Sequence, residues 1–226
     1  MIPIRDNIRS RRFPMVNVTL IIINIVLFIY EQSLNQGRLV ELITTFGVSP
    51  RKLSAMVIGE YPILPAALPL FTAMFLHGGW LHLVGNMLYL WIFGDNVEDR
   101  FGRLRYLLVY LGAGAAGSLA QYLANPLAAE PVIGASGAIA GVLGAYFISY
   151  PRAKVLTLLP IFFFITFIEI PAFTFLFLWF ILQWLNGFLT MAVPGNAVAW
   201  WAHIGGFVAG IISVWVFAPA KRRRYL

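Results

Sequence analysis

The chain has 226 residues, of which 60% are hydrophobic and only 11% are charged, and its mean hydropathy is +0.82. Values this far from those of soluble domains exclude a water-soluble globular protein and indicate a polytopic membrane protein. The net charge of +7 would also suit a nucleic-acid-binding protein, but the positions of the basic residues point to a membrane surface instead.

Six apolar segments follow one another along the chain, and six membrane-spanning helices are the natural interpretation. They cover residues 15–30, 70–93, 106–124, 136–149, 172–191 and 197–217. The first follows a basic stretch, as a signal peptide does, but no small-residue cleavage site comes after it, so we predict a retained helix. The sequence therefore predicts an all-α membrane domain with a six-helix bundle over residues 15–218, and basic tails at 1–14 and 219–226.

Two connections between the predicted spans are long. Residues 31–69 are rich in proline toward their end, and we expect a partly structured loop that lies along the membrane. Residues 155–170 are apolar enough to suggest a seventh span, but they contain Pro160 and Glu169. The segment is also shorter than the roughly 20 residues that a crossing helix needs. We therefore predict an interfacial or re-entrant connection there.

The basic residues are distributed unequally between the two sides of this topology. Thirteen fall on the side of both termini, namely Arg5, Arg9, Arg11, Arg12, Arg100, Arg103, Arg105, Arg152, Lys154, Lys221, Arg222, Arg223 and Arg224. The opposite side receives only Arg38, Arg51 and Lys52. By the positive-inside rule, we expect both termini in the cytoplasm of a bacterial or archaeal cell, with the basic flanks against anionic lipid.

Four polar side chains lie within these apolar segments, namely His82, Asn86, Ser136 and His203. A polar group at membrane depth must find a partner and is seldom retained without a task. A rise of about 1.5 Å per residue, counted from the expected cytoplasmic helix ends, places all four in one layer about 10 Å below the outer boundary. This coincidence predicts one site assembled from three helices. The loop 125–135 must then dip inward to reach Ser136.

Glycines recur at helical spacing beside the serine and the second histidine, and they form small faces on both helices. The faces consist of Gly137, Gly141 and Gly144 on one helix and of Gly206 and Gly210 on the other. Small faces allow two helix backbones to come into contact in lipid. We therefore expect the Ser136 hydroxyl within hydrogen-bond reach of the His203 imidazole, as a base-activated nucleophile requires.

The motifs around these groups resemble those of the rhomboid intramembrane serine proteases. Members of that family carry a His-x-x-x-Asn pair on the second helix, Gly-x-Ser-Gly at the start of the fourth, and a His followed by spaced glycines on the sixth. The matching residues here are His82 with Asn86, Gly134 to Gly137, and His203 with Gly206 and Gly210. The segment 94–102 after the second helix is also rhomboid-like, and the resemblance covers nearly the whole chain.

The resemblance implies an enzyme that hydrolyses peptide bonds in or beside transmembrane segments of other proteins. Ser136 would be the nucleophile and His203 its general base, in a dyad rather than a triad. His82, Asn86 and the backbone N–H of Ser136 would form the oxyanion hole. The implied partners are transmembrane protein substrates and the lipid bilayer. Neither nucleic acid nor a cofactor or metal is expected, and the oligomeric state stays open.

The sequence departs from some family members at two places. It has Ala140 where some relatives carry a Tyr that supports the catalytic histidine, so the resemblance does not say what orients His203. It also lacks a Trp-Arg pair within residues 31–69, so the function of that loop cannot be taken from the family.

Two other classes of protein share part of this pattern. A catalytically inactive rhomboid-like binding or quality-control factor would have the same fold, but such proteins typically lack the serine or the histidine. A small transporter would also hold polar groups inside a helical bundle, although paired broken helices are not evident here. A metalloprotease is excluded, because His77 and His82 are five residues apart and the chain has neither a His-Glu-x-x-His motif nor a cysteine.

Overall fold

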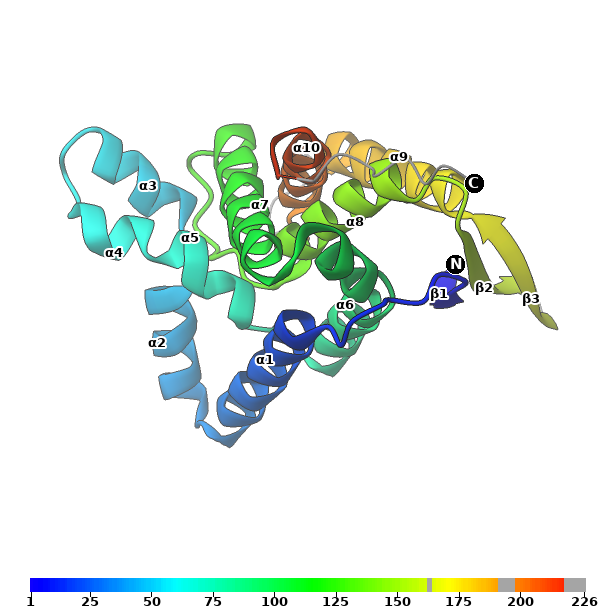
Figure 1. Ribbon diagram of the computed structural model, residues 1–226. Coiled ribbons are helices and arrows are strands. Elements are labelled where there is room, and N and C mark those ends of the chain that lie inside the picture. Colours follow the sequence, from blue (N-terminus) through cyan, green and yellow to red (C-terminus); the bar gives the residue numbers. More distant parts are fainter. Residues whose placement is uncertain (162–163, 191–197, 218–226) are drawn as a thin grey trace.

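The computed structural model describes residues 1–161, 164–190 and 198–217. A helix corresponds to each of the six predicted apolar segments. These helices are α1 (Met15–Ser33), α6 (Trp80–Phe101), α7 (Arg103–Ala124), α8 (Ser136–Ser149), α9 (Ala172–Leu189) and α10 (Trp200–Phe217). Helices α6, α7, α8 and α10 form the centre of the bundle, with α1 beside α6 and α9 beside α10 (Figure 1).

Helix length and composition identify an integral membrane protein but do not establish six spans. Among the described residues, α1, α7, α9 and α10 are long and apolar enough to cross a membrane. A fifth span results if the helices over 63–75 are joined to α6, from which they are bent by 79°. Helix α8 has 14 residues, fewer than the roughly 20 that a crossing helix needs.

Helix α6 begins and ends later than the sequence predicts. The apolar pattern predicts a helix over residues 70–93, but α6 starts at Trp80 and continues to Phe101, where Gly102 with a φ of 80° ends it. His82 therefore lies in the first turn of α6, and the segment 94–102 forms its end rather than a separate loop. The depths predicted for His82 and Asn86 are counted from a cytoplasmic helix end near residue 93. Because α6 continues to Phe101, those two depths are wrong.

The connection over residues 31–69 is largely helical. It contains α2 (Gln36–Phe46), α3 (Pro50–Val57) and α4 (Ile63–Ala67), and it leads into α5 (Pro69–Thr72) and the 3₁₀ helix η1 (Ala73–Phe75). The side chains of Asn35 and Ser49 accept hydrogen bonds from the first turns of α2 and α3, as good N-caps do. The prediction of a partly structured loop is therefore confirmed.

A three-stranded antiparallel sheet contradicts the all-α prediction. Its strands are β1 (Ile2–Asp6), β2 (Lys154–Ile161) and β3 (Phe164–Pro171), in the order β1-β2-β3. The predicted N-terminal tail and the predicted interfacial segment 155–170 thus pair with each other. The physical reason is that 155–170 is rich in β-branched and aromatic residues, and a short apolar run does not distinguish a strand from a buried helix. The predicted tail 219–226 lies outside the described residues.

Asp6 joins this sheet to the helical bundle. Its carboxylate accepts hydrogen bonds from Asn96 Nδ2 of α6, at 2.8 Å, and from the Tyr146 hydroxyl of α8. Burial raises the pKa of the Asp6 carboxyl, and the hydrogen bond from Tyr146 opposes that rise. The N-terminal strand is therefore attached to α6 and α8, two of the three helices that carry predicted site residues.

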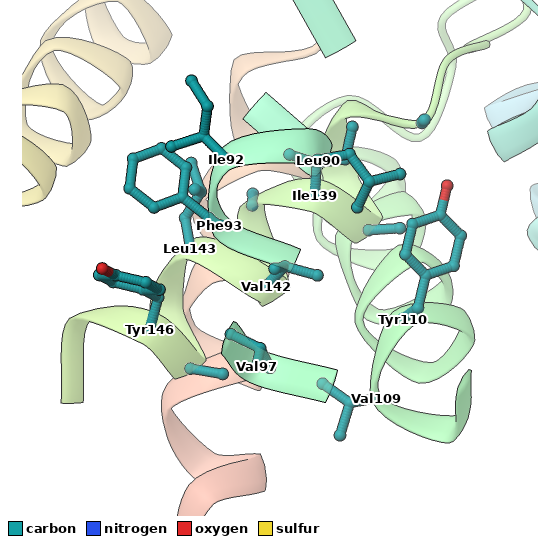
Figure 2. Close-up of a cluster of buried hydrophobic side chains, with 14 of the residues drawn as sticks. Leu90, Ile92, Phe93, Val97, Val109, Tyr110, Ile139, Val142, Leu143 and Tyr146 are labelled. Atoms are coloured by element: carbon teal, nitrogen blue, oxygen red, sulfur yellow. The ribbon is translucent and has the colours of Figure 1, made fainter. Parts of the chain in front are cut away.

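The core that supports the site lies between α6, α7 and α8. Figure 2 shows side chains from these three helices packed together, namely Leu90, Ile92, Phe93, Val97, Val109, Tyr110, Ile139, Val142, Leu143 and Tyr146. Helix α1 is held to α6 by a polar contact, because the Glu98 carboxylate accepts the backbone N–H groups of Val16 and Asn17 at 3.1 and 2.7 Å. These N–H groups have no partner within a helix, so an acidic side chain there stabilises the start of α1.

Helices α8 and α10 pack with their backbones in contact. A Cβ built on Gly206 would overlap the carbonyl oxygen of Gly137, and one built on Gly210 would overlap the carbonyl oxygen of Gly141. The predicted approach of the two small faces is therefore confirmed. A Cβ on Gly141 would overlap Ala113 of α7, so α8 is enclosed from a second side as well.

Candidate active site

The packing of α8 against α10 brings Ser136 and His203 together. Ser136 is the first residue of α8, and His203 lies in the first turn of α10. His203 Nε2 is 2.8 Å from Ser136 Oγ, and both residues are partly buried. A hydroxyl hydrogen-bonded to an imidazole is the arrangement in which a base can withdraw the proton of a nucleophile.

A third side chain reaches His203 from α9. Gln183 is buried, and its Oε1 lies 2.8 Å from His203 Nδ1. Its Nε2 donates a hydrogen bond to the Trp179 carbonyl at 3.1 Å. Sequence reasoning missed Gln183, although one signal was present, because an amide inside an apolar span needs a partner just as a serine or histidine does.

His82 lies against the loop that precedes Ser136. Its Nδ1 accepts a hydrogen bond from the Gly78 N–H at 3.4 Å. Gly134 has a φ of 121°, and a Cβ there would lie 2.7 Å from His82 Nε2. Gly134 also donates its N–H to the Ala73 carbonyl at 2.9 Å. The first glycine of the Gly-x-Ser-Gly motif is thus required for the loop to pass this close to the imidazole ring.

Asn86 lies one turn after His82 on α6. It is buried, and its Nδ2 has no hydrogen-bond partner in the described part of the chain. A buried donor without an acceptor costs about 1–3 kcal/mol, so its presence in a native structure requires an explanation. A donor kept for a reaction intermediate is one such explanation. Within residues 1–161, 164–190 and 198–217, no hydrogen bond joins His82 or Asn86 to Ser136 or His203.

A small cavity of about 20 Å³ adjoins Ser136. It is lined by residues of α7, α8, η1 and the segments before α8 and α10, including Ser118 and Gly134. A volume of this size holds about one water molecule. The loop 125–135 forms part of its wall and is fixed by a bridge between Val132 and Val48.

Two further buried polar residues, His77 and Glu31, lie next to one another near the start of α6. The sequence analysis considered only His77, as a metal ligand. The ring centroid of His77 is 5.2 Å from that of His82. Both carboxylate oxygens of Glu31, at the end of α1, lie 3.3 Å from the backbone nitrogen of His77, whose N–H they accept. No cluster of three or more potential metal ligands occurs among the described residues. Glu31 therefore fixes the backbone that leads into α6.

The chain is similar in sequence to one family of known proteins. Residues 66–220 match a family model described as "Rhomboid domain". The chain is 42% identical over 105 residues to "Rhomboid protease GluP" of Bacillus subtilis, which covers 46% of this chain and 18% of that protein. It is 42% identical over 77 residues to "Putative rhomboid protease YdcA" of the same species, covering 34% of this chain and 38% of the relative.

A longer match extends to a eukaryotic protein. The chain is 26% identical over 185 residues to "Rhomboid protein 1, mitochondrial" of Saccharomyces cerevisiae, which covers 77% of this chain and 49% of the yeast protein. The chain thus matches less than half the length of each of these three relatives.

Proposed function

The chain belongs to the rhomboid family, and on that premise we propose that it is an intramembrane serine endopeptidase acting on transmembrane segments of membrane proteins. The observation that carries the proposal is the 2.8 Å contact between His203 Nε2 and Ser136 Oγ. A serine hydroxyl is a weak nucleophile until an adjacent base accepts its proton. An inactive binding factor or a small transporter would have no need of this contact.

Peptide cleavage would proceed in two steps at this dyad. Ser136 Oγ attacks the scissile carbonyl carbon while His203 Nε2 takes the hydroxyl proton, and the protonated imidazole then gives that proton to the leaving amine. A water molecule, activated by His203 in the same way, hydrolyses the resulting ester and regenerates the serine. The small cavity beside Ser136 supports this second step, because it is large enough for one water molecule.

The negative charge that develops on the carbonyl oxygen would be stabilised by His82, Asn86 and the backbone N–H of Ser136. Asn86 Nδ2 supports this assignment because it is a buried donor without a partner among the described residues. Ser136 supports it because the first N–H groups of a helix have no acceptor within the helix. Donors that are already in place in a low-dielectric site stabilise such a charge strongly.

We further propose six spans with both termini in the cytoplasm. The basic residues on that side support the orientation. The cluster Lys221 to Arg224, which contributes to the count, lies outside the described residues. The relatives include both bacterial and mitochondrial proteins, so the comparisons do not favour a bacterial or archaeal membrane over a mitochondrial one.

A fluorophosphonate probe tests the proposed function directly. The probe reacts only with a serine that a base activates, so it should label the detergent-solubilised protein at a single position, Ser136, as located by peptide mass spectrometry. A folded protein that resists the probe would instead support the inactive binding factor or the transporter.

Replacing Asn86 by Ala should lower the turnover number by about 10²-fold, the order of magnitude for loss of one oxyanion donor, and leave substrate affinity nearly unchanged. The reason is that the donor acts on a charge that exists only in the transition state. Steady-state cleavage of a model transmembrane substrate in detergent gives both constants. Weaker affinity with unchanged turnover would make Asn86 a substrate-binding or packing residue.

A further inference from the structure

We propose that Gln183 is the positioning residue of His203 and holds its imidazole in the tautomer that can accept the Ser136 proton. This inference rests on the proposed dyad and extends it to α9, a helix from which the sequence predicts no site residue. It also answers what orients His203 in a chain that has Ala140 where some relatives carry a tyrosine.

The hydrogen bonds of Gln183 define which ring nitrogen of His203 carries the hydrogen. Because the amide nitrogen of Gln183 donates to the Trp179 carbonyl at 3.1 Å, the amide oxygen is the atom that faces His203 Nδ1 at 2.8 Å. An amide oxygen can only accept, so Nδ1 must carry the hydrogen. His203 Nε2 is then unprotonated and can accept from the Ser136 hydroxyl.

The surroundings of Gln183 suit a neutral acceptor. The residue is 7% exposed, on a helix whose other residues are mostly apolar, where an unpaired carboxylate would be strongly disfavoured. An amide provides the oxygen that fixes the histidine tautomer without placing a charge there. The rings of Trp179 and Trp200 lie 6.1 and 6.0 Å from the imidazole, centroid to centroid, and enclose it further.

Replacing Gln183 by Met tests the role, because methionine has nearly the same length and volume but no strong acceptor. Turnover should fall roughly 10- to 100-fold with little change in KM, since the base is then misoriented while substrate binding is untouched. Gln183→Glu, which retains an acceptor oxygen, should recover part of the loss. Asn186→Leu is the matched control, because Asn186 donates to the Leu182 carbonyl one turn earlier on α9 in the same way.

Nitrogen-15 NMR of histidine-labelled protein reports the tautomer itself, and the chain has only three histidines. We expect the Nδ1–H form of His203 in the wild type and a mixture of both forms in Gln183→Met. An Nε2–H form in the wild type would overturn the inference whether or not any variant folds. The inference would also be overturned if Gln183→Met had the same turnover and the same His203 tautomer as the wild type. Failure of the dyad itself is distinguishable, because the wild type would then not react with the fluorophosphonate probe.

From a separate feature of the fold, we infer that strands β2 and β3, which form a hairpin, lie in the headgroup layer of the membrane, against phospholipid. Three large apolar side chains of β3 are mostly exposed, with Phe164 at 78%, Ile165 at 67% and Phe167 at 57%. In the sheet register, Phe167 pairs with Leu158, which pairs with Ile2 of β1. An apolar row thus crosses all three strands.

Two features of the hairpin point to lipid as the occupant of this surface. The strand β3 leads directly into α9, a candidate span on which Phe173 and Phe177 are exposed as well. The base of the hairpin is charged instead, with Lys154 and Glu169 paired at 2.9 Å and Arg5 close by on β1. Apolar side chains next to a charged base are the pattern of a segment that lies at a membrane surface.

The backbone limits how deep the hairpin can lie. Because β3 is at the edge of the sheet, its outer N–H and C=O groups have no strand partner among the described residues. Such groups are not tolerated in the hydrocarbon core, where nothing can hydrogen-bond to them. In the headgroup layer the apolar side chains can contact lipid, and the free N–H and C=O groups of β3 can still hydrogen-bond to headgroups or water.

The absence of cysteine allows a clean test with single labels at Ile165→Cys and Phe167→Cys, each carrying an NBD fluorophore in vesicles of phosphatidylethanolamine and phosphatidylglycerol. Shallow doxyl lipids should quench both labels several-fold more strongly than aqueous iodide does. Phe173→Cys provides the lipid-facing reference, and free NBD-cysteine provides the aqueous one. Iodide quenching equal to that of free NBD-cysteine would overturn the inference. The inference would also be overturned if protection of the labels from iodide disappeared when the protein-to-lipid ratio is lowered. A second copy of the chain, rather than lipid, would then cover the hairpin.

Discussion

Replacing Ser136 by Ala, or His203 by Ala, is expected to abolish cleavage of a model transmembrane substrate while leaving the fold and membrane insertion intact. The two side chains form one chemical unit, joined at 2.8 Å, so loss of either removes most of the rate enhancement. The double variant should therefore be no less active than either single variant. Cleavage by purified protein in detergent or proteoliposomes measures all three.

Ser149→Ala is the matched control for this experiment. Ser149 lies on the same helix and is buried, and its hydroxyl has no partner among the described residues, so its removal breaks no hydrogen bond. Activity should stay within about twofold of the wild type, as is usual for a substitution without a lost interaction. Cleavage above background by folded Ser136→Ala would refute the serine mechanism.

Replacing Gly206 or Gly210 by Val is expected to inactivate the enzyme without changing any catalytic atom. The first side-chain carbon at either position would overlap a backbone carbonyl of α8, at Gly137 or Gly141, so α8 and α10 must separate. A displacement of about 1 Å costs around 10²-fold when a base must stay within hydrogen-bond reach of its nucleophile. Fluorophosphonate labelling of Ser136 and proteolysis should be lost together.

The same geometry predicts that alanine is only slightly better tolerated than valine at these two positions, because its methyl carbon already meets the carbonyl oxygen. The control is Gly112→Val on α7, where no neighbouring atom lies within 4 Å of the position that a Cβ would take. That variant should retain both labelling and cleavage. Full activity of Gly206→Val and Gly210→Val would show that the helices do not pack through these glycines.

Hydropathy and motif spacing were sufficient to predict the membrane class, the presence of six apolar helices and the meeting of Ser136 with His203. These features depend on local properties of the chain. Apolar runs identify helices that lipid can surround, and glycines at helical spacing identify the faces along which two such helices approach. The contact between α8 and α10 could therefore be anticipated from the sequence alone.

The sheet, the true start of α6 and the partner of His203 depended on contacts between distant parts of the chain. The strands over residues 155–170 favour β structure by composition, but the third strand of their sheet, β1, comes from about 150 residues earlier in the chain. The helix predicted over 70–93 starts only at Trp80, and just before it Glu31 of α1 accepts the backbone N–H of His77. Gln183 reaches His203 only because α9 packs beside α10. A hydrogen bond to a remote partner leaves no periodic pattern in either segment, so only the packed chain decides it.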